Sequence, residues 1–464
     1  MNRILLDIGL AFEDSDFQRL CDDSVYLIDY LGDQKHIDHL RNTISSDIIE
    51  YISYERLYSY NTANNEYKFG HDIVTIIDKI VNDKITIDLY DRCLAPYFFN
   101  YSTKTESVLV KMIISSFKFL MDFKPKYFVL YECPHNINTW VVGRVAEIIG
   151  IPVRYCRNNA LPWRNVLLEG MSKNAIMVAE DRFNENSSPF EIDLFLDIEG
   201  RYTKGTNAIK PEYMEVMKEQ KSNKVYSLYR DIKKNWMRPE IVLYKYLCYK
   251  NYSKLCSYEL QENYIVFFLH LQPERTTLPE GYGFQSQYKA ISILNELIPN
   301  NWHILVKEHP ATFYTHCSPF GRWFSFYEEL NSLSKVRLIP LETDPYEIIK
   351  NAKCVSTITG TVGSEALLMG KPVINFGLNS IQGALPYGMY NFVDMQSLKA
   401  FISHILDFHP EDIRKGYREV VISTILNAGL SGIYSKEEWD NGFATRINSN
   451  KISRYKLLHN LLAF

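Results

Sequence analysis

The sequence lacks the features that mark several large classes of protein. None of its eight cysteines forms a C-x-x-C pair, and scattered cysteines in a chain of 464 residues are typical of reduced thiols in a cytosolic protein. This spacing also argues against a zinc site. No run of about 18 apolar residues occurs, so we expect no membrane-spanning segment. The net charge of −4 lacks the basic excess of a general nucleic-acid binder.

Other absences concern the start of the chain and its organisation. The opening stretch MNRILLDIGLAFEDSDF reaches acidic residues after a few apolar ones, which predicts a first strand and not a signal peptide. Internal repeats and low-complexity tracts are also missing. Hydrophobic residues make up 46% of the chain, enough for two or three domains, each with a buried core. We therefore expect a cytoplasmic protein.

Alternation of apolar runs with helical patterns predicts two α/β lobes. In the first, YFVLY is a buried strand, INTWVVGRVAEIIG a helix closed by Gly150, and IPVRY the next strand, which forms a β-α-β unit. From Asn263 to Gly377, five strands and four intervening helices predict a doubly wound parallel sheet. The predicted divisions are a first lobe at 1–195, a basic helical linker at 196–260, a second lobe at 261–430 and a helical tail at 431–464.

The stretch VKEHP ends one strand of the second lobe. The residue before a proline favours extended geometry, and alternation places Lys307 and His309 on one side of the strand. A cation and an imidazole at the carboxyl end of a strand suit an anion such as a nucleotide phosphate. The alternative is that Pro310 only terminates the strand and His309 is a hydrogen-bonded loop residue.

The stretch TITGTVGSEALLMG follows a later strand of the same lobe. Gly360 and Gly363 permit tight backbone turns, hydroxyls come from Thr359, Thr361 and Ser364, and a helix start is a ready site for an anion. Glu365, in the first helical turn, suits ribose hydroxyls or the helix dipole. The pattern is neither a P-loop nor G-x-G-x-x-G, and an ordinary strand-to-helix turn is the alternative.

Two polar loops also follow strands. Gln272, Glu274 and Arg275 lie with His270 in a long loop broken by prolines and glycines, which predicts a functional loop or a lid. In the first lobe, Glu132 and His135 follow a buried strand and suit a general base for an acceptor hydroxyl. The alternative there is that Asn136 caps a helix and Glu132 neutralises a cation.

Two charged stretches carry weaker signals. Asp14 and Asp16 form a D-x-D, which offers too few oxygen ligands for Mg²⁺ and is better interpreted as a solvated acidic turn. Residues 221–254 are basic and rich in tyrosine, with Trp236 among them. We favour a linker helix packed by its tyrosines over a helix lying on an anionic membrane face, and keep the second open.

The ordered set LHLQPERTTLPEGYGFQSQ, VKEHP and STITGTVGSEALLMGKPVINFG resembles the capsule polysaccharide biosynthesis family, bacterial surface-glycan proteins that include Kdo transferases. The likeness is closest over residues 263–392 and weaker over 120–170. It implies a GT-B fold, two Rossmann-like doubly wound lobes facing a cleft, with an acceptor-side first lobe and a second lobe that holds the donor nucleotide.

The resemblance also implies roles for particular residues. His309 would contact the CMP phosphate, the 359–364 turn would add phosphate contacts, and Glu365 would lie near the ribose. Related transferases carry an acid–acid–glycine base motif in the first lobe. This chain lacks that motif at the expected place, so Glu132 and His135 stand in as candidate catalytic residues beside His309.

Together these patterns lead to a functional prediction. With the resemblance, they imply a metal-independent glycosyltransferase of capsule or lipopolysaccharide synthesis that transfers a sugar, such as Kdo or another ulosonate from CMP, to a glycan or lipid-linked acceptor. No cofactor is expected beyond the nucleotide-sugar substrate, and peripheral association at the inner membrane through 221–254 stays open. The alternatives are a nucleotide-sugar epimerase, a polyol-phosphate transferase, or a non-enzymatic membrane-assembly scaffold.

Overall fold

The computed structural model describes most of the chain, in segments. The described segments are residues 3–8, 14–24, 26–59, 71–94, 103–158, 164–171, 176–177, 189–204, 239–257, 263–272, 274–309, 311–314, 322–378, 385–426 and 430–431. Pro310, most of the basic stretch and nearly all of the predicted tail lie outside them. The chain divides into two compact units: Met1–Asn184 with Ala428–Lys436 and Thr445–Phe464, and Glu185–Asn427 with Glu437–Ala444.

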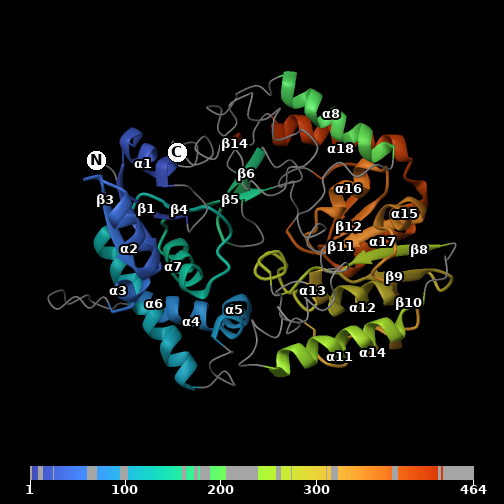
Figure 1. The fold of residues 1–464 in the computed structure, drawn as a ribbon, viewed down its shortest axis with the longest axis horizontal. Coiled ribbons are helices and arrows are strands. Elements are labelled where there is room, and N and C mark those ends of the chain that lie inside the picture. The colour runs from blue at the N-terminus through green and yellow to red at the C-terminus, as the bar shows by residue number, and fades with distance from the viewer. Residues whose placement is uncertain are drawn as a thin grey trace. The chain divides into compact units, whose positions relative to one another are not determined.

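The second unit contains a six-stranded sheet in which every pairing is parallel, in the order β10-β9-β8-β11-β12-β13 (Figure 1). Its strands are β8 (Tyr264–Phe268), β9 (His303–Lys307), β10 (Val336–Ile339), β11 (Cys354–Thr357), β12 (Val373–Asn375) and β13 (Met389–Asn391). The chain moves outward from β8 to one edge of the sheet, then returns to β11 and moves outward to the other. This is the Rossmann strand order, with its topological switch point between β8 and β11.

The helices of this unit connect and flank the strands. They are α8 (Pro189–Thr203), α11 (Pro239–Leu255), α12 (Tyr288–Leu297), α13 (Ala311–Tyr314), α14 (Phe326–Ser332), α15 (Pro345–Asn351), α16 (Val362–Leu368), α17 (Met395–Ser403), the 3-10 turn Ile405–Asp407, α18 (Pro410–Val420) and the π-turn Val421–Leu426. Local signals fix two of the ends. The Asp344 side chain accepts from Tyr346 N–H and caps α15, and Gly370 follows α16 with φ of 73°.

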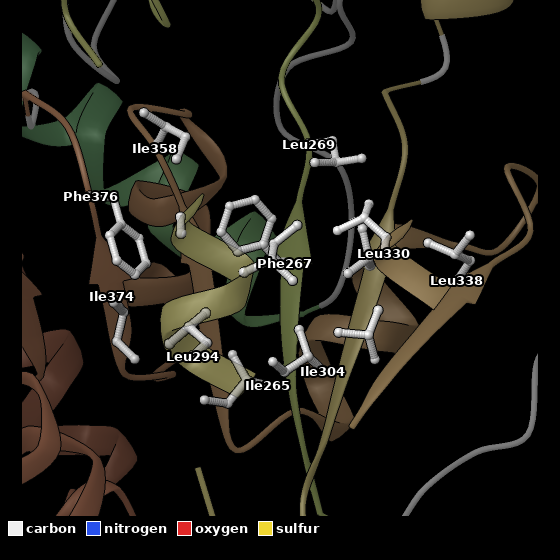
Figure 2. Close-up of a cluster of buried hydrophobic side chains, with 14 of the residues drawn as sticks. Ile265, Phe267, Leu269, Leu294, Ile304, Leu330, Leu338, Ile358, Ile374 and Phe376 are labelled. Carbon is white, nitrogen blue, oxygen red and sulfur yellow. The ribbon is translucent and has the colours of Figure 1, made fainter. Parts of the chain in front are cut away.

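The core of the second unit lies between the sheet and its helices. Figure 2 shows Ile265 and Phe267 of β8 near Leu294 of α12 and Ile304 of β9, all fully buried. The continuous apolar strands that predicted a two-sided parallel sheet are thus buried as expected. Helix α11, the described part of the basic stretch, packs Tyr252 and Cys248 into this core, which confirms a helix packed by tyrosine for that part.

The first unit is built on a mixed sheet in the order β14-β6-β5-β4-β1-β2-β3, with β7 paired to β6. Its strands are β1 (Arg3–Asp7), β2 (Leu27–Gly32), β3 (Ile49–Ser53), β4 (Phe128–Leu130), β5 (Val153–Asn158), β6 (Arg164–Glu169), β7 (Ile176–Met177) and β14 (Leu430–Ser431). Strands β3 to β5 along this order are parallel, and the pairs of β6 are antiparallel. The parallel part has its own switch point, between β1 and β4.

The helices of the first unit are α1 (Asp14–Asp23), α2 (Gln34–Thr43), α3 (Tyr54–Tyr58), α4 (His71–Val81), α5 (Lys84–Leu94), α6 (Thr103–Phe123) and α7 (Ile137–Ile148). The predicted β-α-β unit is confirmed as β4-α7-β5, with Gly150 following α7 at φ of 85°. The predicted acidic turn was wrong in one respect. Asp14 and Asp16 lie in the first turn of α1, where carboxylates favour the helix dipole.

The fold class predicted from the sequence is confirmed: both units are α/β units with Rossmann-like parallel strands. Two such units are the components of a GT-B fold. Within the described residues, no helix combines the length and the apolar character needed to cross a bilayer.

Candidate functional site

The switch point of the second unit brings together two loops that are 89 residues apart in sequence. The Thr359 backbone N–H donates to Nε2 of His270 at 3.1 Å, and the Thr357 hydroxyl lies 3.0 Å from the same nitrogen. Burial, together with the charges of His309 and Arg322, lowers the pKa of His270 to about 3. The imidazole is therefore neutral and holds the loop after β11 against the loop after β8.

The turn after β11 is tight. The Gly360 N–H donates to the Thr357 hydroxyl at 3.2 Å, and a Cβ at Gly360 would lie 2.7 Å from that oxygen, so only glycine fits. Thr361 is exposed and caps α16 without a side-chain bond, whereas Gly363 packs beside Val373. Of the predicted turn residues, Thr361 is the one with an exposed side chain.

The exit of β9 carries Lys307 and His309. The Lys307 ammonium donates to the carbonyl oxygens of Leu341 and Pro340, at 2.8 and 3.4 Å, and its burial lowers its pKa to about 8. Burial is also the largest influence on His309, whose pKa falls to about 4. At neutral pH His309 thus offers a neutral N–H and not a positive charge.

Glu308, between these two residues in sequence, is fully buried. Its carboxylate accepts hydrogen bonds from the Arg322 guanidinium at 2.8 and 2.9 Å, from the Tyr327 phenol at 2.7 Å and from the His309 backbone N–H at 2.7 Å. Burial alone would raise the pKa of Glu308, but the Arg322 charge and these hydrogen bonds hold it below its ordinary value. The β9 exit is therefore built around a buried carboxylate.

The loop after β8 is packed onto the rest of the unit. The Thr359 hydroxyl donates to the Thr276 carbonyl at 2.8 Å, and Leu378 N–H donates to the Glu280 carbonyl at 2.9 Å. The three residues of this loop that were predicted to bind the nucleotide have hydrogen-bond or ion-pair partners within the unit. Gln272 accepts from Arg322 at 2.9 Å, Glu274 accepts from Thr276 at 2.9 Å, and Arg275 lies 3.3 Å from Glu280.

Glu365 and Ser364 lie in the first turns of α16 beside two tyrosines. The Tyr417 phenol hydrogen-bonds Ser364, and the charge of Glu365 raises the pKa values of Tyr202 and Tyr417 beyond the effect of burial. Burial raises the pKa of Glu365 itself to about 7. This carboxyl can therefore accept or donate a hydrogen bond near neutral pH.

The switch point of the first unit opens into a hollow of about 820 Å³. The predicted pair lies in its wall: His135 Nδ1 is 3.2 Å from Glu132 Oε1, and both side chains are partly exposed. A carboxylate that accepts from an imidazole orients the ring and raises its basicity, as general-base catalysis requires. Asn136 caps α7 through Asn138 N–H, so the capping alternative is confirmed beside this geometry.

The same hollow holds residues that the sequence analysis did not select. Asp7, the last residue of β1, accepts from the Tyr54 phenol at 2.5 Å and from the Thr139 hydroxyl at 3.0 Å. His36 lines the hollow from α2, and His39 of that helix pairs with Asp14 at 3.0 Å. The sequence offered one signal for Asp7, since a polar residue at the end of a buried strand is a site candidate. The apolar run that contains Asp7 was interpreted only as a strand.

Two further features bear on the sequence predictions. The six cysteines that the structure describes fully are free thiols, as the scattered spacing predicted. Within the described part of the chain, no three or more His, Cys, Asp or Glu side chains gather in a group able to hold a metal ion.

Comparison with known proteins gives one family match. Residues 206–384 match the family model described as capsule polysaccharide biosynthesis protein, and no curated protein matches the chain. Among solved structures, the beta Kdo 2,7 transferase KpsC of Thermosulfurimonas dismutans is 14% identical, with 78% of this chain and 95% of that chain covered and a TM-score of 0.33.

A second solved structure has a similarly low sequence identity. The UDP-GlcNAc 2-epimerase of Methanocaldococcus jannaschii is 13% identical, with 90% of this chain and 98% of that chain covered and a TM-score of 0.26. At TM-scores this low, neither likeness carries an argument about the reaction.

Proposed function

We propose that this chain, whose residues 206–384 match the capsule polysaccharide biosynthesis family model, is a glycosyltransferase that uses a nucleotide-sugar donor. The observation that carries the proposal is the site at the switch point of the second unit. Ligands of open α/β sheets bind beyond the carboxyl ends of the strands at this point. The residues at this point are His270 after β8 and Thr359 and Thr361 after β11. His309 follows the neighbouring strand β9.

The donor that we favour is a CMP-linked ulosonate such as Kdo. The His309 imidazole is neutral, so it would donate one hydrogen bond to the phosphate of the nucleotide, joined by the hydroxyl of Thr361. Lys307 and Arg275 would add positive charge nearby, and Glu365 would meet ribose hydroxyls. In this proposal no metal ion takes part, and the protein's own donors stabilise the negative charge that develops on the departing CMP.

The acceptor would be a surface glycan or a lipid-linked glycan. Transfer forms a bond between the acceptor oxygen and the anomeric carbon of the donor sugar, breaks the bond from that carbon to the CMP phosphate, and releases the hydroxyl proton. The pair of Glu132 and His135 is the proposed base that takes this proton. Asp7, held by Tyr54 and Thr139, is a carboxylate available in the same hollow.

The setting that we propose is the cytoplasmic face of a bacterial inner membrane. Support comes from the described part of the basic stretch, where Lys250 and Lys254 are exposed on α11 beside Tyr246. Lysines beside tyrosines suit an anionic lipid surface.

A transfer assay tests the proposal directly. Purified protein is incubated with CMP-Kdo and capsular or lipopolysaccharide acceptor fragments, and CMP release and product mass are measured. We expect acceptor-dependent CMP release in wild type and its loss in His309→Ala. Equal activity of the two proteins would contradict the assignment of His309.

The second candidate is a nucleotide-sugar epimerase on the same fold. Such epimerases usually carry a D-S-G-G-like turn where this chain has TGTVGSE, which favours transfer. Incubation with UDP-N-acetylglucosamine, followed by separation of the two epimers, distinguishes them. Formation of the 2-epimer would replace the transferase proposal.

A further inference from the structure

Arg322 is a buried, fully hydrogen-bonded side chain near the proposed donor site. It is 1% exposed, and its guanidinium donates four hydrogen bonds. The acceptors are both carboxylate oxygens of Glu308 at 2.8 and 2.9 Å, the carbonyl oxygen of His270 at 2.7 Å and the side-chain oxygen of Gln272 at 2.9 Å. All three nitrogens of the planar guanidinium therefore donate hydrogen bonds.

These hydrogen-bond acceptors lie in the loop after β8 and at the end of β9, which also carry residues of the proposed nucleotide site. His270 and Gln272 follow β8, and Glu308 follows β9. Two of the three acceptor residues, Glu308 and His270, also accept a hydrogen bond from a residue of the proposed site. Glu308 holds the His309 backbone N–H at 2.7 Å, and His270 holds the Thr359 N–H at 3.1 Å.

We propose that Arg322 is a positioning residue of the donor site, and that its guanidinium sets where the imidazoles of His270 and His309 stand relative to each other. This inference rests on the proposed function, because it concerns the same nucleotide site. Arg322 lies in no motif that the sequence analysis selected, and it touches no substrate in this account.

A purely structural ion pair is the competing explanation. Such a pair stabilises the fold without needing a particular fork geometry, and uncharged side chains of similar shape often replace it. The four bonds of Arg322 depend on a planar fork that lysine cannot reproduce. The Arg322 charge also helps to lower the pKa of both imidazoles, so its loss alters their electrostatics as well as their position.

Three variants of the full chain separate the two explanations. Arg322→Lys keeps the charge and removes the fork. The double variant Glu308→Gln/Arg322→Gln removes both charges and leaves no unpaired buried ion. The matched control is Glu199→Gln/Arg418→Gln, which removes another two-bond ion pair of the same unit, 2.8 and 2.9 Å long, between α8 and α18.

For each protein, CMP affinity is measured by calorimetry, the two histidines by ¹⁵N NMR, and stability by urea unfolding. We expect Arg322→Lys and the Glu308/Arg322 double variant to weaken CMP binding by about tenfold or more and to shift the signals of His270 and His309. The control should lose stability while its CMP affinity and both signals stay as in wild type.

The inference is overturned if the Glu308/Arg322 double variant binds CMP like wild type with both signals unshifted. It is also overturned if both Arg322 variants fail to fold, since Arg322 would then be a stability residue. If wild type binds no nucleotide, the proposed function fails separately. The histidine spectra still test the role of Arg322 in that case, because unshifted signals in Arg322→Lys would contradict a positioning role.

Discussion

His270 accepts a hydrogen bond from the backbone N–H of Thr359 through Nε2, at 3.1 Å, across the switch point of the second unit. A backbone N–H can only donate, so this nitrogen carries no proton and the ring is neutral. The buried position, with the pKa lowered to about 3, agrees with that assignment. One neutral imidazole thus fixes the distance between two loops that the sequence separates.

Replacement of His309 tests its role at the phosphate. We expect His309→Asn to reduce transfer by about 100-fold, because the shorter amide holds its hydrogen-bond donor farther from the developing phosphate charge, while the urea midpoint changes little. His303→Asn is the matched control, since His303 begins the same strand at its opposite end. Equal losses in the two variants would show that His309 acts only through the fold.

Replacement of the candidate base tests the hollow of the first unit. We expect Glu132→Gln and His135→Gln each to lower kcat by about 10²- to 10⁴-fold with a smaller change in KM. The control is His404→Gln, which removes a histidine from another His–carboxylate pair three residues apart, 2.8 Å from Asp407. A full kcat in both first-unit variants would move the base to another residue, and Asp7→Asn would then be measured.

Acid should destabilise the protein through its buried imidazoles. The folded-state pKa values of His270 and His309 are about 3 and about 4, below the ordinary 6.5. Between pH 6.5 and pH 4 the unfolded chain therefore binds protons that the folded chain does not, so the free energy of unfolding falls as pH falls. We expect a loss on the order of 2 kcal/mol per imidazole by pH 4.5.

Urea unfolding of wild type and His309→Gln at pH 7 and pH 4.5 measures this effect. The variant lacks one of the two imidazoles, so its stability should fall less between the two pH values. An identical fall in both proteins would contradict a neutral buried His309.

Glu365 should have the opposite effect on the pH dependence of stability. Burial raises its pKa from 4.5 to about 7, so the folded chain keeps a proton that the unfolded chain releases as pH rises through this window. Stability is therefore lost as pH rises from about 4.5 to about 7. We expect Glu365→Gln to be more stable than wild type at pH 8, by on the order of 3 kcal/mol, and equally stable at pH 4. Thermal unfolding at the two pH values checks this, and an unchanged difference between them would contradict it.

Much of the fold could be predicted because its signals are local. Apolar runs such as YIVFF and HILVK are typical of strands buried on both faces, as in a parallel sheet, and Asn136, Asp344 and Gly370 mark helix ends by their own chemistry. The β/α alternation predicts parallel strands but not their order, since doubly wound sheets of more than one strand order share it. These features depend on residues close together in sequence.

The site was predictable only in part, because its contacts are not local. Alternation predicts that Lys307 and His309 lie on one side of the strand, but it does not show that Lys307 would donate to the carbonyls of Leu341 and Pro340. Arg322 was not predicted because its three partner residues lie 14 to 52 residues away and no sequence pattern links them. Asp7 was missed because a polar residue that ends a strand looks like part of the strand.

Calorimetric titration of the wild-type protein with CMP, UDP and GDP tests the central claim most directly. The account predicts saturable binding of CMP, tighter than that of UDP or GDP, which weakens by about tenfold or more in His309→Asn and is unchanged in His303→Asn. Absence of binding for all three nucleotides would contradict a donor site in the second unit and would favour a non-enzymatic scaffold.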